Sequence, residues 1–393
     1  MKKKNAGHPP LNGIDSKKFL TDYWHKKPLL IRGAFPDFQE PVSPGELAGL
    51  SCEKGITSRI IIERGGKVPW EVLHGPFKKK TFAGLPKNRW TLLVNGVDRY
   101  VPEVHRLLDA FTFLPSWRID DVMISYAADG GGVGAHVDNY DVFLIQAAGE
   151  REWQINTRPE LEDDYIPDRA VRQLRKFKPN RTWVLQAGDM LYLPPRVPHN
   201  GIARGDGCMT YSIGFRAPSH AELLDSATTF ALSRIDDKLR FGDADLRPQP
   251  HGEISSAALD RVQQILRSSF LNREELIEWF GGLVTEPKDE DVEMPPERPL
   301  TVAELKKSLA AGARITRSEG SRLAYHDVSS RESMLFVNGR SYVLKGPTRP
   351  LGKLLTGQIR IPSRDMEQAL ASKPAAELVM ELINSGVFYL QAG

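Results

Sequence analysis

Residues 183–213 read WVLQAGDMLYLPPRVPHNGIARGDGCMTYSI, and this stretch decides what fold we expect. Short apolar runs, rich in β-branched and aromatic residues, alternate in it with clusters of Gly, Pro, Asn and Asp. That pattern is typical of strands joined by turns. No segment with helical periodicity separates the runs, which disfavours a parallel sheet with helical crossovers. The stretch therefore predicts an antiparallel β-barrel or sandwich.

The strand pattern extends toward the N-terminus, and a different pattern replaces it further on. Strand-like runs occupy residues 28–31, 122–126, 142–145 and 153–155. Apolar residues at helical spacing then predict helices within residues 219–285. A Pro-rich acidic stretch at 286–299 is typical of a linker. Beyond it, the capping box Thr301–Glu304 and the turn Asn338-Gly339 predict a helix and a hairpin.

These changes of pattern predict an α+β chain in three parts. They are a strand-rich domain of residues 1–218, a helical segment with an acidic linker at 219–298, and a winged-helix-like domain at 299–393. A few helices without a sheet cannot bury their apolar faces alone, so we expect the middle part to pack on a neighbour or on a second copy of the chain.

Composition excludes several classes of protein. The chain has 393 residues, and no apolar run approaches the roughly 20 residues of a membrane span. The basic N-terminus lacks the apolar core of a secretory signal. Two cysteines, Cys52 and Cys208, exclude a disulfide framework or a Cys-rich zinc site and fit a reducing cytoplasm. Any metal must therefore be held by histidines and carboxylates.

Charge is distributed unevenly along the chain. Residues 1–220 carry a net +6, residues 221–298 a net −8 and residues 299–393 a net +5. Basic outer parts are consistent with an anionic partner such as a ribonucleoprotein. The alternative is that charge simply varies along the chain, so contact with nucleic acid stays open.

Three His-x-Asp/Glu pairs occur in the chain, and such a pair on an extended strand places both side chains on the same side. His220 and Glu222 follow Ser219 in a pattern typical of a helix cap. The pair His251 and Glu253 lies in a Pro- and Gly-rich loop. Only the third pair, His136 and Asp138, lies in the strand-rich part.

His199, at the end of the run GDMLYLPPRVPHNG, is a suitable third ligand for a metal at His136 and Asp138. Two imidazoles and one carboxylate leave coordination positions open, which is the arrangement of non-haem iron(II) oxygenases. The open positions can take a chelating keto acid and dioxygen. The sequence therefore predicts a metal site at His136, Asp138 and His199.

A keto acid such as 2-oxoglutarate also needs a cation for its distal carboxylate. Arg151 is the candidate, with Ser125 on the preceding strand as an added hydroxyl; the alternative is a surface salt bridge from Arg151 to Glu150 or Glu152. The glycine cluster at 130–134 matches a dinucleotide fingerprint. A strand-like segment follows it instead of a helix, so we expect a tight turn or space for a substrate chain.

Taken together, Ser125, His136-x-Asp138, Arg151 and GDMLYLPPRVPHNG resemble a JmjC-type 2-oxoglutarate oxygenase, and more closely the bacterial ribosomal oxygenases. The segment DYWHKKPLLIRGAF at residues 22–35 resembles the start of that family. The resemblance implies a double-stranded β-helix (cupin/JmjC) barrel, a helical dimerisation segment and a C-terminal winged-helix-like domain. It therefore also implies a homodimer.

The same resemblance implies the activity. Bacterial members hydroxylate the β-carbon of an arginine in the large-subunit ribosomal protein numbered sixteen, using Fe(II), 2-oxoglutarate and dioxygen. It implies that the cosubstrate is bound by Ser125 and Arg151, and that the metal ligands are His136, Asp138 and His199. Asp129 is either a partner for the substrate guanidinium or a turn residue. The alternatives are a JmjC-type demethylase, a histidine hydroxylase and a non-catalytic cupin/winged-helix regulator.

Overall fold

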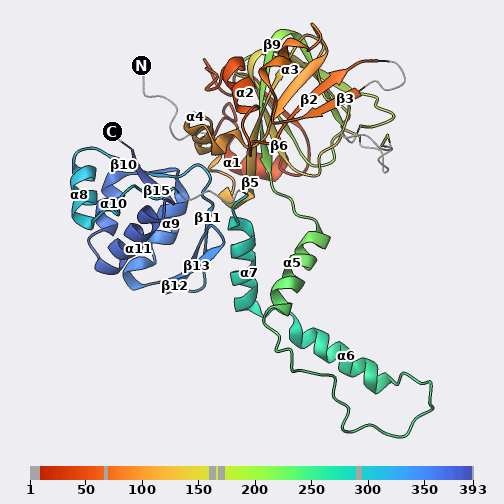
Figure 1. The fold of residues 1–393 in the computed structure, drawn as a ribbon, viewed down its shortest axis with the longest axis vertical. Helices are drawn as coiled ribbons and strands as arrows, with labels where there is room; N and C mark the ends of the chain where they lie inside the picture. The colour runs from red at the N-terminus through yellow and green to blue at the C-terminus, as the bar shows by residue number, and fades with distance from the viewer. Residues whose placement is uncertain (1–8, 66–69, 159–164, 167–172, 289–293, 392–393) are drawn as a thin grey trace.

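The computed structural model describes residues 9–65, 70–158, 165–166, 173–288 and 294–391. Figure 1 shows a barrel, a smaller domain beside it that contains the C-terminus, and a helical arm that extends away from both. Within the described residues, no helix is long and apolar enough to cross a membrane.

The barrel is built from one nine-stranded sheet in which every neighbouring pair is antiparallel. The strand order is β1-β8-β6-β9-β5-β4-β2-β3, with β7 paired to β6. The strands are β1 (Leu29–Ile31), β2 (Ser58–Glu63), β3 (Trp70–His74), β4 (Trp90–Val94), β5 (Ile119–Ala127), β6 (Val142–Ile155), β7 (Arg181–Leu185), β8 (Met190–Leu193) and β9 (His199–Phe215). The expected double-stranded β-helix barrel is confirmed.

Alternation along β6 and β8 buries both faces of the sheet. Phe143 belongs to the larger core, and its neighbour Leu144 belongs to a second core together with Trp153 and Leu191. Successive side chains of a strand point to opposite faces, so runs that are apolar at every position are buried on both sides. The larger core lies between the sheet and the short helices α1 (Ser16–Asp22), α2 (Pro44–Leu50), α3 (Lys79–Ala83), η1 (Val97–Arg99), α4 (Pro102–His105) and η2 (Arg106–Phe111). A further short helix, η3 (Ser116–Arg118), precedes β5.

One detail of the first helix differs from expectation. The sequence suggests Ser16 as its N-cap, but the cap is Asp15, whose side chain accepts a hydrogen bond from the backbone N–H of Lys18. A carboxylate one residue earlier reaches the third N–H of the helix, and Ser16 becomes the first helical residue.

The helical arm consists of α5 (His220–Leu232), α6 (Ser256–Ser269) and α7 (Arg273–Thr285). α7 returns to the rest of the molecule and packs on β11 to β13; a Cβ added at Gly281 would lie 2.3 Å from the ring of Phe336. In contrast, α5 and α6 contain no buried residue, and Leu232, Leu259 and Leu266 remain exposed. The structure thus packs α7 on the C-terminal domain. α5 touches α7 through the hydrogen bond from Nε1 of Trp279 to Oγ of Ser226 at 3.0 Å, but these three leucines of α5 and α6 stay exposed (Figure 1).

The C-terminal domain is winged-helix-like, as predicted. Its elements are α8 (Val302–Ala310), β10 (Arg314–Arg317), β11 (Leu323–Asp327), β12 (Glu332–Val337), β13 (Arg340–Lys345), η4 (Gly346–Thr348), α9 (Leu351–Gly357), β14 (Arg360–Ile361), α10 (Ser363–Ala369), α11 (Lys373–Asn384) and β15 (Phe388–Gln391). The predicted capping box of Thr301 and Glu304 is present. The turn Asn338-Gly339 has φ of 48° and 81°, as a two-residue hairpin of this type requires.

Candidate metal centre

The backbone brings His136 and His199 side by side. His199 is the first residue of β9, and His136 lies between β5 and β6. The two residues form an isolated antiparallel bridge, with N···O distances of 3.0 and 2.9 Å. Asp138 is tied to the turn before His199, because its carbonyl oxygen accepts from the N–H of Arg196 at 2.8 Å. The Pro194-Pro195 turn that follows β8 therefore delivers the third side chain to the first two.

The three side chains converge on one point. One ligand atom from each of His136, Asp138 and His199 lies within 4.8 Å of the others. The Nε2 of His199 is 3.6 Å from Oδ2 of Asp138, and the two imidazole centroids are 4.2 Å apart. Among the described residues, this is the one group of three or more His, Cys, Asp or Glu side chains with such spacing.

Backbone carbonyls select the tautomer of both imidazoles. Nδ1 of His136 lies 2.9 Å from the carbonyl oxygen of Gly134, and Nδ1 of His199 lies 2.8 Å from that of Val197. A carbonyl only accepts, so each Nδ1 carries the proton and each Nε2 keeps its lone pair. Hydrogen bonds of this kind orient metal-binding histidines in general. The residues present therefore fit a divalent iron ion.

Burial keeps His199 neutral. The side chain is 3 % exposed, and burial, followed by the neighbouring His136, lowers the pKa of His199 to about 4, against the opposing effect of Asp138. Neutral imidazole is the form that binds a metal. The hydroxyl of Tyr140 is also affected by this group: burial, followed by the charge of Asp138, raises the pKa of Tyr140. The carboxylate of Asp138 thus acts on a residue that the sequence analysis did not single out, although Tyr140 follows it by two positions.

Arg151 lies in the middle of β6 and is 4 % exposed. Its Nε and Nη2 atoms have no hydrogen-bond partner among the described residues, and its guanidinium lies 5.8 Å from the ring of Trp153. The ring of Trp153 is in turn 5.9 Å from that of His199. A buried guanidinium without a partner is costly, so the site is suited to an anionic ligand.

The alternative of a surface salt bridge from Arg151 is wrong. Glu152 pairs with Arg204, and Glu150 accepts a hydrogen bond from Gln186 at 2.8 Å. Neither acid reaches Arg151, because successive residues of β6 point to opposite faces of the sheet.

Ser125 lies on β5, and its side chain is buried. The residue pairs across the ladder with Thr210 of β9, and its Oγ lies 3.4 Å from the Thr210 carbonyl oxygen. The hydroxyl of Thr210 in turn donates to Oε1 of Gln146 at 3.0 Å. These two hydrogen bonds therefore link β5, β9 and β6 through buried polar side chains.

Asp129 lies at the exposed corner between β5 and the segment that leads to His136. One carboxylate oxygen accepts from the N–H of Gly205 at 2.7 Å, and the N–H of Asp129 donates to Asp206 at 3.1 Å. The structure thus gives Asp129 a turn role and leaves its second oxygen at the surface. It does not place Asp129 within the group of three ligands.

The glycine cluster allows two strands to approach closely. A Cβ at Gly131 would lie 2.3 Å from the carbonyl oxygen of Trp90, and one at Gly132 would lie 2.5 Å from that of Gly201. No larger residue fits between β4, β9 and this segment, which continues to His136. Gln173, which the sequence analysis also missed, is buried here and donates from Nε2 to the carbonyl oxygen of Val133 at 2.8 Å.

The two competing histidine pairs have the roles that local sequence predicts. Glu222 and Ser219 form the capping box of α5, with the N–H of Glu222 3.1 Å from the Ser219 hydroxyl. His251 and Glu253 are exposed in an irregular segment. Neither pair contributes to the metal centre.

Comparison with protein families matches two parts of the chain. A JmjC domain matches residues 106–223, and a ROXA-like winged helix matches residues 264–389. An AraC-like ligand binding domain, a further match, covers residues 179–280.

Individual proteins are also similar to this chain. The Escherichia coli (strain K12) protein named ribosomal protein uL16 3-hydroxylase is 32 % identical over 374 residues, which is 95 % of this chain and 97 % of that protein. A probable ribosomal oxygenase of Haemophilus influenzae is 32 % identical over 66 % of this chain and 65 % of its own length. The X-ray structure of E. coli ycfD superposes with a TM-score of 0.84 at 31 % identity, covering 96 % of this chain and 99 % of that one. A structure of that ribosomal oxygenase with cobalt and 2-oxoglutarate gives 0.81 over 97 % and 99 %.

Proposed function

This chain belongs to the JmjC-type ribosomal oxygenases, and on that premise we propose that it hydroxylates the β-carbon of an arginine in ribosomal protein uL16, with Fe(II), 2-oxoglutarate and dioxygen. One observation supports the proposal above the others. It is the group His136, Asp138 and His199, with both Nδ1 atoms held by carbonyls and both Nε2 atoms left to bind a metal. The name of the E. coli relative supports the choice of substrate.

His136, Asp138 and His199 would hold the iron, and the bound iron would supply the redox chemistry that activates dioxygen. The three side chains leave part of the coordination sphere to 2-oxoglutarate and dioxygen. Their own contribution is preorganisation: the bridge between His136 and His199 and the two carbonyl contacts keep the imidazoles in place before any ligand binds.

Arg151 would bind the distal carboxylate of 2-oxoglutarate, with Ser125 as a second polar contact. The support for this assignment is the burial of Arg151 and the two guanidinium nitrogens that find no partner in the described chain. An ion pair formed in a buried site is screened less than one at the surface, so a single arginine suffices to anchor a dicarboxylate.

Asp129 would bind the guanidinium of the substrate arginine. Its free carboxylate oxygen at the exposed corner supports this role, because the other oxygen already fixes the side chain on Gly205. A carboxylate fixed in this way loses less conformational freedom when it binds a cation.

We further propose that residues 1–218 form the catalytic domain, residues 219–298 the dimerisation segment with its linker, and residues 299–393 the winged-helix-like domain of a cytoplasmic homodimer. The exposed leucines of α5 and α6 support the dimer, because the same helices of a second copy of the chain carry the same apolar side chains and could cover them.

The test is turnover with intact uL16. The wild-type protein, loaded with Fe(II) and supplied with 2-oxoglutarate, should form succinate and add the mass of one oxygen atom to one arginine-containing peptide. His136→Ala and Asp138→Ala should abolish both signals. The exposed His74, replaced in His74→Ala, provides a control that should retain them.

Other outcomes identify the alternatives. Oxygen added to a histidine would make the protein a histidine hydroxylase, and loss of a methyl group would make it a demethylase. Salt-dependent binding to duplex DNA, without metal binding or turnover, would contradict the enzyme and leave the regulator.

A further inference from the structure

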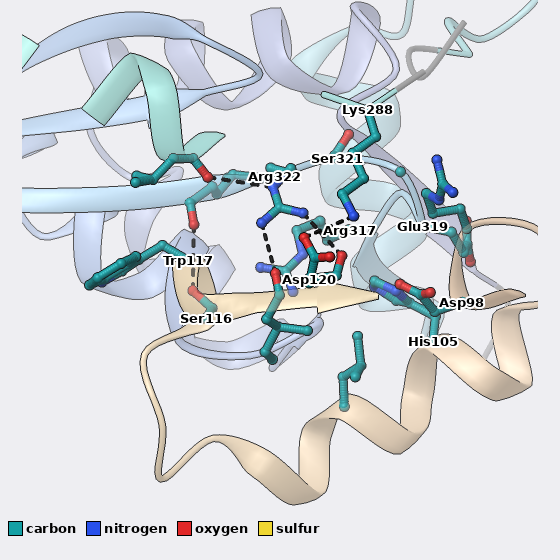
Figure 2. A pocket seen from close by; sticks show the side chains of 16 residues that line it. Asp98, His105, Ser116, Trp117, Asp120, Lys288, Arg317, Glu319, Ser321 and Arg322 are labelled. Atoms are coloured by element: carbon teal, nitrogen blue, oxygen red, sulfur yellow. Dashed lines mark hydrogen bonds and ion pairs between the residues drawn. The ribbon is translucent and has the colours of Figure 1, made fainter. Parts of the chain in front are cut away.

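A cavity with charged side chains in its lining lies between the barrel and the winged-helix-like domain, and none of the three residues of the metal centre lines it. Its volume is about 60 Å³, and Figure 2 shows the side chains around it. The barrel contributes residues near α4 and the start of β5, and the C-terminal domain contributes the segment from the end of β10 to the start of β11. The lining includes Asp98, His105, Asp120, Lys288, Arg317 and Arg322.

Two buried side chains at this cavity lack hydrogen-bond partners. His105 is 4 % exposed, and neither ring nitrogen has a partner among the described residues. Arg317 is 9 % exposed, and its Nε likewise has none. They belong to different domains, since His105 ends α4 and Arg317 ends β10. Buried donors without partners are costly, so their convergence on one cavity indicates a ligand that accepts hydrogen bonds.

The three carboxylates of the lining already have partners. Asp98 accepts from the backbone N–H of Val122 at 2.7 Å, and Glu319 accepts from the hydroxyl of Tyr389 at 2.9 Å. Asp120 pairs with Lys288, which also lines the cavity, at 2.8 Å. Asp109, whose charge favours the cationic form of Arg317, accepts from the N–H of Ile359 at 3.4 Å. No carboxylate of the described chain makes an ion pair with Arg317.

The lining holds four cationic side chains, those of Arg99, Lys288, Arg317 and Arg322, against these three carboxylates. Burial, followed by the charges of Arg317 and Arg106, lowers the pKa of His105 to about 3. Burial, and then the charge of Arg216, lowers the pKa of Arg322 to about 10, although Arg322 donates to the carbonyl oxygen of Ile119 at 2.8 Å. Cations thus outnumber carboxylates by one at a cavity where Arg317 makes no ion pair with a described residue, and an anion is the ligand that this arrangement favours.

We propose that this cavity binds a small oxyanion of the size of phosphate, with Arg317 and His105 as donors from opposite domains. The cavity holds roughly four oxygen-sized atoms, as a tetrahedral anion requires. A ligand that bonds to both domains stabilises their present arrangement. This site is separate from the metal centre, and its occupancy does not depend on iron or 2-oxoglutarate.

The test is thermal unfolding of the full-length, metal-free protein with inorganic phosphate, against sodium chloride at matched ionic strength. A ligand at about ten times its Kd should raise the Tm of this chain by roughly 2 °C. Arg317→Met should weaken phosphate binding at least about tenfold, since hydrogen bonds to charged groups are involved. The matched control is Arg331→Met, because Arg331 is an exposed arginine of the same domain. It should respond to phosphate as the wild type does.

His105→Phe is a second variant, on the barrel side of the cavity, for the case that Arg317→Met fails to fold. It should also lose the rise in Tm caused by phosphate. Crystals soaked with selenate provide a direct readout, with anomalous density expected between Arg317 and His105. The proposal is overturned if the wild type shows no phosphate-specific shift, if both variants keep it, or if selenate binds only elsewhere. None of these readouts requires turnover, so failure here leaves the proposed oxygenase untouched.

Discussion

At the scale of single residues, the most informative side chain is Arg151, because its burial depends on a local irregularity of β6. Ile145 and Ala147 face the larger core, but Trp153 and Ile155, which are also odd-numbered, face the second core. The register of β6 against β9 shifts twice between Gln146 and Glu150. Within this irregular stretch the odd-numbered side chains of β6 change from one face of the sheet to the other, and so Arg151 lies on the side of Trp153.

Replacement of Arg151 tests its proposed role directly. Arg151→Gln removes the positive charge and the pair of parallel N–H donors that a guanidinium offers to a carboxylate. We therefore expect the KM for 2-oxoglutarate to rise roughly 10- to 100-fold. Steady-state kinetics with varied 2-oxoglutarate measure this, with Arg204→Gln on the adjacent strand as the control. An unchanged KM in Arg151→Gln would contradict the assignment.

His105 should make stability depend on pH. Its pKa is about 3 in the folded protein, against roughly 6.5 in an unfolded chain. Between these values the unfolded state binds more protons, so the free energy of unfolding decreases as pH falls through this window, by at most about 1.4 kcal/mol per pH unit. Asp98 acts oppositely, since burial raises its pKa to about 7 and stability on its account decreases as pH rises toward that value.

The variant His105→Phe separates the contribution of His105 to this pH dependence from that of other groups. His105→Phe should show a shallower dependence of unfolding free energy on pH between about 6 and 4. Urea titrations at several pH values, in buffers without phosphate, measure the slope. The exposed His74, replaced in His74→Phe, should leave it unchanged, and identical slopes in all three proteins would refute this account of His105.

At the scale of elements, the metal centre depends on how closely three segments approach one another. His136 is held against His199 only because the segment before it lies against β4 and β9 without side chains at Gly131 and Gly132. The glycines are therefore positioning residues, and a methyl group in their place must displace backbone.

Gly132→Ala tests this dependence. Its Cβ would lie 2.5 Å from the Gly201 carbonyl oxygen, so we expect a loss of about 1–3 kcal/mol in unfolding free energy and weaker metal binding. Calorimetry and titration with cobalt(II) measure the two effects. Gly242→Ala, at a position where nothing lies within 4 Å, is the control. Unaltered metal affinity in Gly132→Ala would show that the approach is not needed.

At the scale of the whole molecule, the arm formed by α5 and α6 is the part that the chain does not cover by itself. Leu232, Leu259 and Leu266 are about three-fifths exposed, at 62 %, 58 % and 59 %. Leu259 and Leu266 lie seven residues apart on α6 and so share one face of that helix, and exposed apolar side chains grouped in this way mark an interaction surface. α7, in contrast, is covered by the winged-helix-like domain.

Charges placed on this face should separate the proposed dimer. Leu259→Glu combined with Leu266→Glu should yield a monomer of 44.0 kDa in sedimentation, where the wild type should show about twice that mass. Gln264→Glu adds a negative charge to the opposite side of α6 and should leave the dimer intact. A double variant that sediments like the wild type would contradict this interface.

The sequence alone was sufficient for features that depend on local chemistry. The antiparallel strands, the capping boxes at Ser219 and Thr301 and the hairpin at Asn338 follow from alternation, side-chain capping and turn preference, all of which act over a few residues. His136, Asp138 and His199 were also predicted from sequence, because two histidines and one carboxylate in the strand-rich part suffice to propose a metal site. What only the tertiary structure decided is where distant segments meet. The bulge that buries Arg151, the packing of Gln173 on the glycine segment and the cavity shared by His105 and Arg317 depend on strand register and domain contact, and no periodicity within one segment encodes either.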